Sequence, residues 1–315
     1  MPYTQNVEQH HKLMYADNVQ MVAQQMKNPL VGAVTVVLGS GLAMRVADLI
    51  QKKRAMRGES RSRRNPENPT TATSRWIVMP DQPIQSGQYI DREDKWKMAQ
   101  DPTSAFMRAD VGAVTRGYAD MVMGIEELSD GVFGVTGGGI LGMARDGLSG
   151  GQHGAGAATV LPPAQTVVHG GVGLTLTKLR NARKTLKKAD FGIDQQMDPL
   201  YGAITPEQED DLLGIAAASG ANLNTFEIEQ LKSGTPTKLL GITWIVTNRL
   251  PKTALIRTCA IWSKANIIVG EWDPINGRMW NDTSAQNKPY MLTEFTADAV
   301  RAEDKGVIAI ECQEP

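Results

Sequence analysis

The longest regular pattern of apolar and polar positions runs from Pro102 to Glu126 and predicts one amphipathic helix. Its apolar residues recur at steps of three and four, which places them on one helical face. These residues are Met107, Val111, Val114, Tyr118, Met121 and Ile125. Asp101 can cap the first free amides, and Pro102 suits the first helical position, where no amide hydrogen is needed. The helix would be about 37 Å long, enough to run across a whole domain as a spine.

The forty residues before this helix show no such pattern. Residues 51–64 hold seven basic residues and one acid, and residues 65–75 are mostly turn formers and threonine. Residues 76–79 read as a short strand, which Pro80 and Pro83 end. Together, residues 51–90 read as an extended hairpin arm with little core of its own. Its basic run is either a solvated loop, an arm that docks on another subunit's acidic surface, or a contact to nucleic acid phosphates.

The rest of the chain predicts helices and strands that are segregated, which is typical of an α+β fold. Helices are expected at 4–27 and 226–231. A third helix is expected at 175–189, capped by Thr175, with four residues facing inward: Leu176, Leu179, Ala182 and Leu186. A fourth is expected to begin with a capping box from Thr205 to Gln208 and to carry the apolar residues Leu212, Leu213 and Ile215. Residues 30–50 predict a strand or turn followed by a short helix. Strands are expected at 239–247, 254–263, 266–272, 290–296 and 306–312.

Composition narrows the class of protein. The 315 residues carry a formal net charge of −1, and aromatic residues make up 5% of the chain, so neither a global basic field nor a base-stacking surface is indicated. Cys259 and Cys312 stand far apart without close partners, which favours buried thiols in a reducing compartment. The sequence contains neither a membrane-spanning apolar run nor a signal peptide, so we expect a soluble protein made in a cytosol.

Two glycine patterns suggest enzymes, and neither is supported by its surroundings. Gly137, Gly139 and Gly142 match a dinucleotide-binding pattern, but no buried strand precedes them and no acid lies between Gly147 and Ala189. This segment is expected to be a flexible loop or to pack backbone closely against backbone. Ser149 lies in a GxSxG pattern. Hydrolases with this pattern need an acid between the serine and the histidine along the chain, and none lies between Ser149 and either His153 or His169. We therefore expect no catalytic residues, no cofactor and no metal.

Four segments, taken in order, resemble the major capsid proteins of tailed bacteriophages, which have the Hong-Kong-ninety-seven-type fold. They are YADNVQMVAQQ (15–25), the stretch from DREDKWKMAQ to MVMGI (91–125), GGVGLTLTKLRNARKTLKKAD (170–190), and LLGITWIVTNRLP with RTCAIWSKANIIVGEWD (239–273). The chain is most similar to a podovirus-like phage capsid group. The order and spacing of the segments carry the resemblance, because each is a weak motif alone.

The resemblance implies a division of the chain. It gives an N-terminal arm at 1–30, an extended loop at 51–90, an axial domain at 130–285, and a peripheral domain with the spine helix at 31–50, 91–129 and 286–315. The implied function is structural: self-assembly into pentamers and hexamers of an icosahedral head that encloses double-stranded DNA. The protein would be located in the virion capsid, after assembly in the host cytoplasm, and it would not be an enzyme.

The resemblance also implies partners and contact residues. Only about 50 residues precede the loop, so scaffolding is expected from a separate protein, with portal and cement proteins as further partners. No lysine lies between Arg54 and Asp94, so a shell without covalent crosslinks is expected. The expected intersubunit contacts are Arg57, Arg61, Arg63, Arg64 and Trp76 on the loop, and Tyr15, Val19, Val22 and Met26 on the arm. The alternatives are a glycine-loop hydrolase or nucleotide-binding enzyme, and a DNA-binding internal virion protein.

Overall fold

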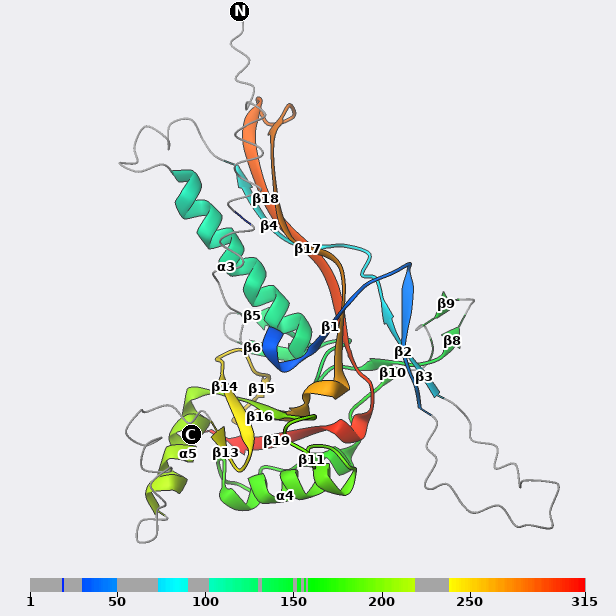
Figure 1. Ribbon diagram of the computed structural model, residues 1–315. Coiled ribbons are helices and arrows are strands. Elements are labelled where there is room, and N and C mark those ends of the chain that lie inside the picture. Colours follow the sequence, from blue (N-terminus) through cyan, green and yellow to red (C-terminus); the bar gives the residue numbers. More distant parts are fainter. Residues whose placement is uncertain are drawn as a thin grey trace, which may run out of the picture.

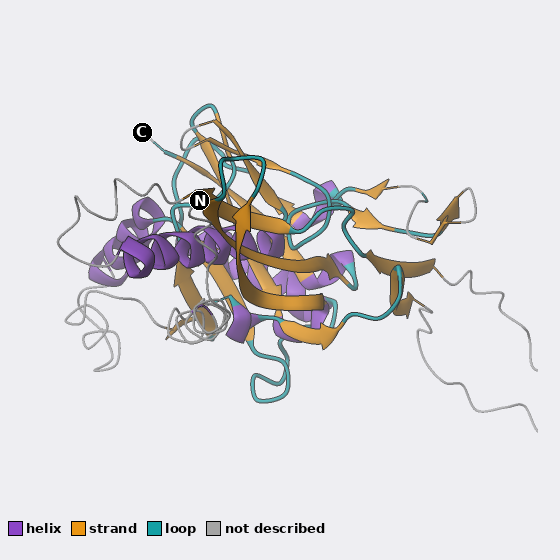
Figure 2. Ribbon diagram, turned by 90° about the horizontal axis from the view of Figure 1, so that it is seen from above, coloured by secondary structure: helices purple, strands orange, loops and turns teal. Residues whose placement is uncertain are grey.

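The chain has an α+β fold built around one long helix and two sheets. The computed structural model describes residues 19, 30–49, 73–89, 102–129, 132–149, 152–153, 156, 158–218 and 238–314. Helix α3 and a four-stranded sheet form an elongated part, and a larger sheet with helices α4 and α5 forms a second part below it (Figure 1). From above, most helical residues lie on one side, and short strands project on the other (Figure 2).

Helix α3 (Pro102–Met123) is the predicted spine. Pro102 is its first residue, as expected, and Asp101 lies outside the described residues. The predicted end at Glu126 is wrong, because Gly124 has a left-handed backbone (φ 72°) that ends the helix. Ile125 begins strand β5 instead. The predicted apolar face is buried except for Met121, which is partly buried, and Val122 is also fully buried.

The four-stranded sheet covers one side of α3. Its order is β1 (Thr35–Leu38), β17 (Ile267–Asp282), β18 (Lys288–Arg301) and β4 (Ile84–Tyr89). β17 and β18 form a long antiparallel hairpin, while β1 runs parallel to β17. On α3, Tyr118 packs against Phe295 of β18 with ring centroids 5.5 Å apart. The strands predicted at 266–272 and 290–296 are therefore confirmed, and both are longer than the sequence pattern indicated.

Strands β2 (Ala43–Leu49) and β3 (Thr73–Val78) pair with each other as an antiparallel two-stranded sheet. The short helix expected within residues 30–50 is wrong. Residues 31–33 form a 3-10 turn (η1, Val31–Ala33), and the run after it becomes β1 and β2. Pairing with β3 overrides the local pattern, because a strand is stabilised by its partner more than by its own propensity. The strand predicted at 76–79 is confirmed as β3.

The glycine-rich region forms short strands rather than one regular element. These are β5 (Ile125–Ser129) with β6 (Val132–Val135), β7 (Ala144–Arg145) with β10 (Ala158–Thr159), and β8 (Leu148–Ser149) with β9 (Gln152–His153). Isolated bridges join Gly137 to Met143 and Gly139 to Val300 of β18. The segment thereby runs across the junction between the two parts of the molecule.

A seven-stranded sheet forms the second part. Its main order is β11 (Thr166–Val167), β19 (Val307–Gln313), β16 (Ile256–Ser263), β12 (Leu200–Ile204), β14 (Ile242–Val246) and β13 (Lys238–Leu239), and β15 (Lys252–Thr253) pairs with β16. Three further 3-10 turns join elements: η2 (Pro163–Gln165), η3 (Lys264–Asn266) and η4 (Asp304–Gly306). The strands predicted at 239–247, 254–263 and 306–312 are confirmed in this sheet.

The predicted cap of α4 is present, and half of the predicted capping box of α5 is present. Thr175 caps α4 (Leu176–Lys188) by accepting a hydrogen bond from the Lys178 amide. At the start of α5 (Pro206–Ala218), Gln208 Oε1 accepts the Thr205 amide, and the Thr205 hydroxyl donates to the same oxygen instead of capping the Gln208 amide. Leu179, Ala182 and Leu186 are buried as predicted, and Leu212 of α5 is buried as well. The expected inward position of Leu176 is wrong, because its side chain lies in the first turn of α4 and is exposed. The helices predicted at 4–27, apart from Val19, and at 226–231 lie outside the described residues.

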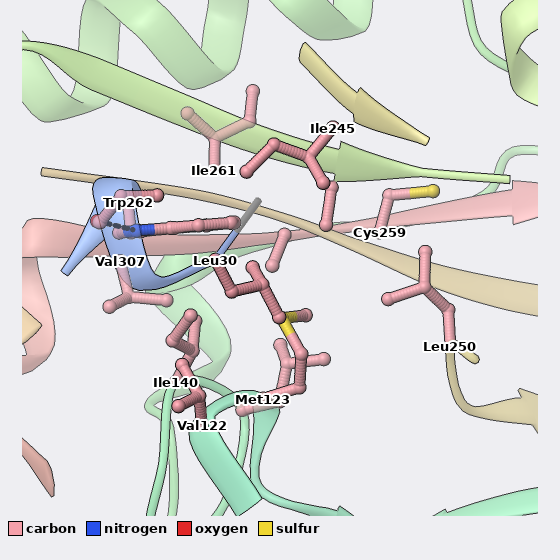
Figure 3. Close-up of a cluster of buried hydrophobic side chains, with 14 of the residues drawn as sticks. Leu30, Val122, Met123, Ile140, Ile245, Leu250, Cys259, Ile261, Trp262 and Val307 are labelled. Atoms are coloured by element: carbon pink, nitrogen blue, oxygen red, sulfur yellow. Dashed lines mark hydrogen bonds between the residues drawn. The ribbon is translucent and has the colours of Figure 1, made fainter. Parts of the chain in front are cut away.

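One hydrophobic core joins the two parts (Figure 3). Val122 and Met123, at the end of α3, belong to the same buried cluster as Ile261 and Trp262 of β16. The Trp262 indole Nε1 donates a hydrogen bond to the Ala33 carbonyl at 2.9 Å, which ties β16 to η1. Cys259 and Cys312 are both buried free thiols, as predicted. No helix in the described ranges is long and apolar enough to cross a membrane.

Candidate functional site

The β2–β3 hairpin projects from the junction between the two parts of the molecule (Figure 1). Its base packs through Ile77, which is fully buried against Ala144 and Val300. A bulge between Arg45 and Ala47 bends β2 where it leaves the body, since an extra residue on one strand increases the local twist. The hairpin is therefore held firmly at its base. Its two strands form a two-stranded sheet, and one isolated bridge joins Arg75 to Asp146.

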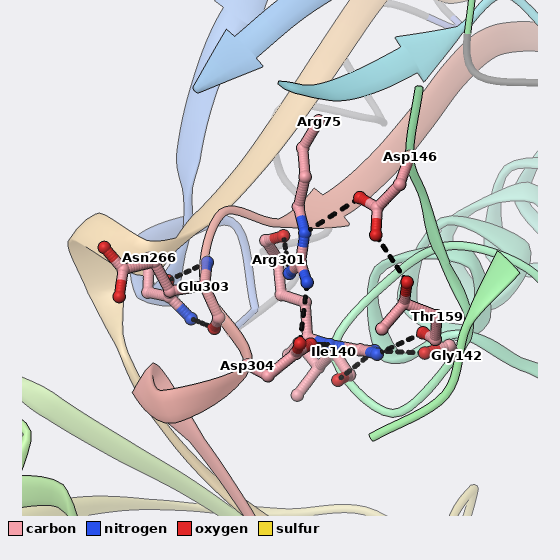
Figure 4. A network of polar contacts seen from close by, with 9 residues as sticks. All are labelled: Arg75, Ile140, Gly142, Asp146, Thr159, Asn266, Arg301, Glu303 and Asp304. Carbon is pink, nitrogen blue, oxygen red and sulfur yellow. Dashed lines mark hydrogen bonds and ion pairs between the residues drawn. The ribbon is translucent and has the colours of Figure 1, made fainter. Parts of the chain in front are cut away.

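Arg75, on β3, fixes this base to three other segments (Figure 4). Its guanidinium donates through Nε to Asp146 Oδ1 at 3.1 Å, through Nη1 to the Arg301 carbonyl at 2.9 Å, and through Nη2 to Asp304 Oδ2 at 2.7 Å. The side chain is only 3% exposed. A buried guanidinium that uses every edge of its planar group holds its partners in one geometry. Arg75 therefore sets where the hairpin leaves the body.

Arg301, at the end of β18, lies directly below Arg75 in the same network (Figure 4). It donates to Asp304 Oδ1 at 2.6 Å and to the Thr159 carbonyl at 2.7 Å, and also to the Gly142 carbonyl. Burial opposes the charge on Asp304, but hydrogen bonds from Arg75 and Arg301 outweigh it and hold the pKa of that carboxyl below its usual range. The carboxylate between the two arginines therefore stays ionised.

The glycine-rich segment provides the carbonyls that Arg301 contacts. Gly138 and Gly139 have left-handed backbones, with φ of 81° and 67°. A Cβ added to Gly142 would collide with the Gly138 carbonyl, and one added to Gly139 would collide with the Gly124 amide. The expectation of close backbone packing is therefore confirmed for this segment. Its glycines accommodate neighbouring backbone and a buried arginine rather than a phosphate.

The other enzyme-like features are not assembled into a site. Ser149 lies in β8 and pairs with Gln152 of β9. His169 accepts a hydrogen bond from the Gly171 amide through Nδ1, as part of a local turn. Among the described residues, no three His, Cys, Asp or Glu side chains gather as a metal site would require.

A second arginine connects the spine helix to the second part of the molecule. Arg249, in the loop between β14 and β15, donates to both carboxylate oxygens of Asp120 on α3, at 2.7 and 2.6 Å. It also donates to Glu127 at 3.0 Å and lies over the Phe133 ring, 4.7 Å from its centroid. Two parallel bonds to one carboxylate fix orientation as well as distance. This contact therefore restricts how α3 and the seven-stranded sheet can turn relative to each other.

The structure describes two of the contact residues predicted from sequence. Trp76 is half-buried on β3, where it pairs with Arg45. Val19 is fully buried against Met107, Val111 and Met291, next to the spine helix. The remaining predicted contacts lie outside the described residues: Arg57, Arg61, Arg63, Arg64, Tyr15, Val22 and Met26.

Sequence reasoning missed the three arginines that organise the junction: Arg75, Arg249 and Arg301. Arg75 is adjacent to Trp76, so strand alternation places the two side chains on opposite faces. That was the one available signal, and it does not identify a partner. The carbonyl that Arg75 contacts lies 226 residues away in the chain.

Comparisons with known proteins agree with the fold. In structure, the chain is similar to the capsid of an empty GTA particle, with a TM-score of 0.61, 14% identity, and 90% of this chain and 89% of that chain covered. It is also similar to the bacteriophage PhiM1 mature capsid (TM-score 0.55, 10% identity, 91% and 87% covered) and to Mycobacterium phage Che8 (0.53, 12%, 90% and 91%).

These likenesses confirm the α+β fold that the resemblance implied, the fold of phage major capsid proteins. No curated protein sequence matches the chain. Residues 7–314 match the family described as phage capsid protein, which covers nearly the whole chain. This family is structural rather than enzymatic, and its members reside in the virion capsid. The chain belongs to the phage capsid protein family.

Proposed function

We propose that the chain is the major capsid protein of a tailed phage and assembles into the pentamers and hexamers of an icosahedral shell around double-stranded DNA. The supporting observation is the hairpin fastened by Arg75. Its strands leave the body from a buried base and, apart from a single bridge between Arg75 and Asp146, pair with each other in the described ranges. Beyond this anchored base, a projecting hairpin gains little stability on its own subunit, since an isolated two-stranded ribbon is marginal in water. It gains stability by lying on a neighbour.

The proposal divides the chain as the resemblance implied. Residues 1–30 form the arm, 51–90 the extended loop, 130–285 the axial domain, and 31–50, 91–129 and 286–315 the peripheral domain with the spine helix. The pairing of β4 with β18 favours one refinement. Residues 84–89 would then belong with the spine helix, and the extended loop would comprise the hairpin from Ala43 to Val78.

The contacts between subunits are proposed on two surfaces. Trp76 and four arginines of the extended loop (Arg57, Arg61, Arg63 and Arg64) would contact a neighbouring subunit. The apolar face of the arm would contribute Tyr15, Val22 and Met26. Val19, predicted with them, is buried against its own subunit instead. Many modest contacts of this kind add up in a closed lattice, because each bound subunit raises the effective concentration of the next.

The partners beyond the chain itself belong to the same proposal. A separate scaffolding protein, a portal and a cement protein would act with the shell, and the packaged DNA would be contacted without sequence preference. The absence of lysine between Arg54 and Asp94 favours a shell without covalent crosslinks in the loop. Placement in a podovirus-like capsid group rests on the four sequence segments alone.

Electron micrographs of the expressed protein, alone and together with the proteins encoded beside it, test the proposal. Closed shells of uniform size are expected in at least one combination. A protein that stays monomeric under every assembly condition, with residues 51–90 compact on its own surface, would contradict it.

A further inference from the structure

Helix α4 carries a strongly positive surface. Its sequence, LTKLRNARKTLKK, holds six basic residues and no acid. Lys178 is buried and donates to the carbonyls of Val172, Gly173 and Glu311 at 2.8, 2.7 and 2.9 Å, so its role is internal. Arg180, Lys184 and Lys188 are exposed at steps of four, which places them along one face. The last turns of α4 therefore present a cationic surface.

The first turns of α5 carry the opposite charge. Glu207, Glu209, Asp210 and Asp211 follow one another closely, and Glu207 and Asp210 are exposed. Asp211 Oδ2 accepts the Leu174 amide at 2.6 Å, just before α4 begins. This bond holds the acidic turns of α5 beside the start of α4, and Figure 1 shows α5 next to one end of that helix.

The two charged surfaces thus lie at opposite ends of α4. Thirteen residues at 1.5 Å each separate the ends by about 20 Å, too far for an ion pair within one subunit. Across the described ranges, Arg180, Lys184, Lys188, Glu207 and Asp210 form no ion pair. The helix dipole favours acidic residues in the first turns of α5 and basic residues in the last turns of α4, so it explains each cluster on its own helix. They do not explain why each end of α4 also exposes apolar side chains.

Apolar residues accompany the charges at both ends. Val168 and Val172, before α4, are 68% and 47% exposed. Ile193 and Met197, in the loop after α4, are 59% and 84% exposed. Neighbouring exposed apolar side chains surrounded by charge are typical of a surface that another protein covers. Asp190 and Asp194 are also exposed after α4, but five basic residues of the helix outnumber them. Each end of α4 therefore combines exposed apolar side chains with a net charge, positive at its C-terminal end and negative at its N-terminal end.

We propose that these two surfaces bind each other head to tail between copies of the chain. The basic end of α4, with Ile193 and Met197, packs on the acidic first turns of α5 and on Val172 of the next copy. A contact between two different surfaces of identical subunits generates a ring when the rotation closes. This inference rests on the proposed function. Neighbouring subunits within one pentamer or hexamer would be joined by this electrostatic contact.

Charge reversal tests the pairing. K184E/K188E and, separately, E207K/D210K place like charges across the contact and should lower the yield of closed shells at least tenfold. The combined variant K184E/K188E/E207K/D210K restores opposite charges and the wild-type net charge, and should recover most of that yield. A matched control combines K184E/K188E with D81K/E126K, which restores net charge at exposed positions away from α5. It should not recover assembly.

The outcomes separate this inference from the proposed function. A wild-type protein that forms no shells contradicts the proposed function itself. Wild-type shells together with unimpaired reversal variants overturn only the head-to-tail contact. Loss that the combined variant fails to rescue also overturns the contact, and binding of a DNA duplex that falls with K184E/K188E would then assign the basic face to DNA.

A direct measurement does not depend on closed shells. Carbodiimide joins lysine amines to carboxylates in direct contact, and mixing isotope-labelled with unlabelled protein identifies the crosslinks that join different chains. Crosslinks between the 184–188 region of one chain and Glu207 or Asp210 of another are expected in any oligomer. Oligomers that lack these crosslinks while forming others would contradict the proposal.

Discussion

Arg75 on β3 donates a hydrogen bond to the carbonyl oxygen of Arg301 on β18 at 2.9 Å, and both guanidinium groups bind the carboxylate of Asp304. Two buried positive charges thus share one carboxylate. Arg75 also donates to the Asp146 carboxylate, and Arg301 also donates to the carbonyls of Gly142 and Thr159. Removing either arginine leaves buried partners without a donor. The hairpin base is consequently the place where a single substitution should have the largest effect.

Replacing Arg75 with Met should destabilise the unassembled subunit by about 3–5 kcal/mol, the usual cost of breaking a buried ion pair by removing one partner. Urea denaturation measures the loss, and hydrogen exchange should show faster exchange of the amides of residues 73–78. Arg108, exposed on α3, provides the control. R108M should change stability by less than about 0.5 kcal/mol. Equal denaturation midpoints for R75M and R108M would contradict the role assigned to Arg75.

The glycine-rich segment should tolerate no side chain where backbone meets backbone. G142A introduces a Cβ against the Gly138 carbonyl. Residue 142 cannot shift away without moving its own carbonyl, which accepts a hydrogen bond from Arg301. We expect a loss of several kcal/mol or an insoluble protein. Gly32 is the matched control, because an added Cβ there meets nothing within 4 Å. G32A should fold normally, and the pair can be compared by soluble yield and thermal unfolding. Equal behaviour of the two variants would contradict this close packing.

Features formed by residues close together in the sequence were predicted correctly, and features formed by residues far apart in the sequence were not. Local signals predicted the α3 face, the Thr175 cap, half of the Thr205 capping box and most strands, because periodicity and capping act within a few residues. The end of α3 depended on Gly124, whose left-handed backbone lies against the Gly138 carbonyl, and β2 depended on pairing with β3, so both were predicted incorrectly. The arginines at the junction could not be found, because their partners are brought together only by the finished fold.

Glu314 should make the free energy of unfolding depend on pH under acidic conditions. Burial opposes its charge, but hydrogen bonds from Arg257, Lys252 and Gln208 outweigh it and lower the pKa from 4.5 to about 2. A carboxyl with a depressed folded pKa stabilises the fold above its unfolded pKa. That stabilisation should be lost progressively between about pH 4.5 and pH 2.

Substitution with glutamine isolates this effect from the other carboxyls. E314Q should be less stable than the wild type at pH 7, and the difference should shrink as the pH falls through this window. Thermal unfolding of both proteins from pH 7 to pH 2.5 measures it. A difference that stays constant with pH would show that the charge of Glu314 is not what stabilises the fold.

The Asp120–Arg249 contact should couple α3 to the seven-stranded sheet energetically. A double-mutant cycle with D120A and R249A should give a coupling energy of about 2 kcal/mol, as expected for charge-assisted hydrogen bonds that are partly shielded from water. Urea denaturation of the wild type, both single variants and the double variant measures it. A coupling energy below about 0.5 kcal/mol, typical of exposed pairs, would contradict the restraint.

The central claim is that the hairpin from Ala43 to Val78 stabilises a shell by lying on a neighbouring subunit. A cryo-electron microscopy reconstruction of assembled particles tests it most directly. We predict rings of five and six subunits in a closed icosahedral shell, with the hairpin of each subunit packed across the next. A shell in which every hairpin folds back on its own subunit, or a protein that forms no closed shell, would contradict the account.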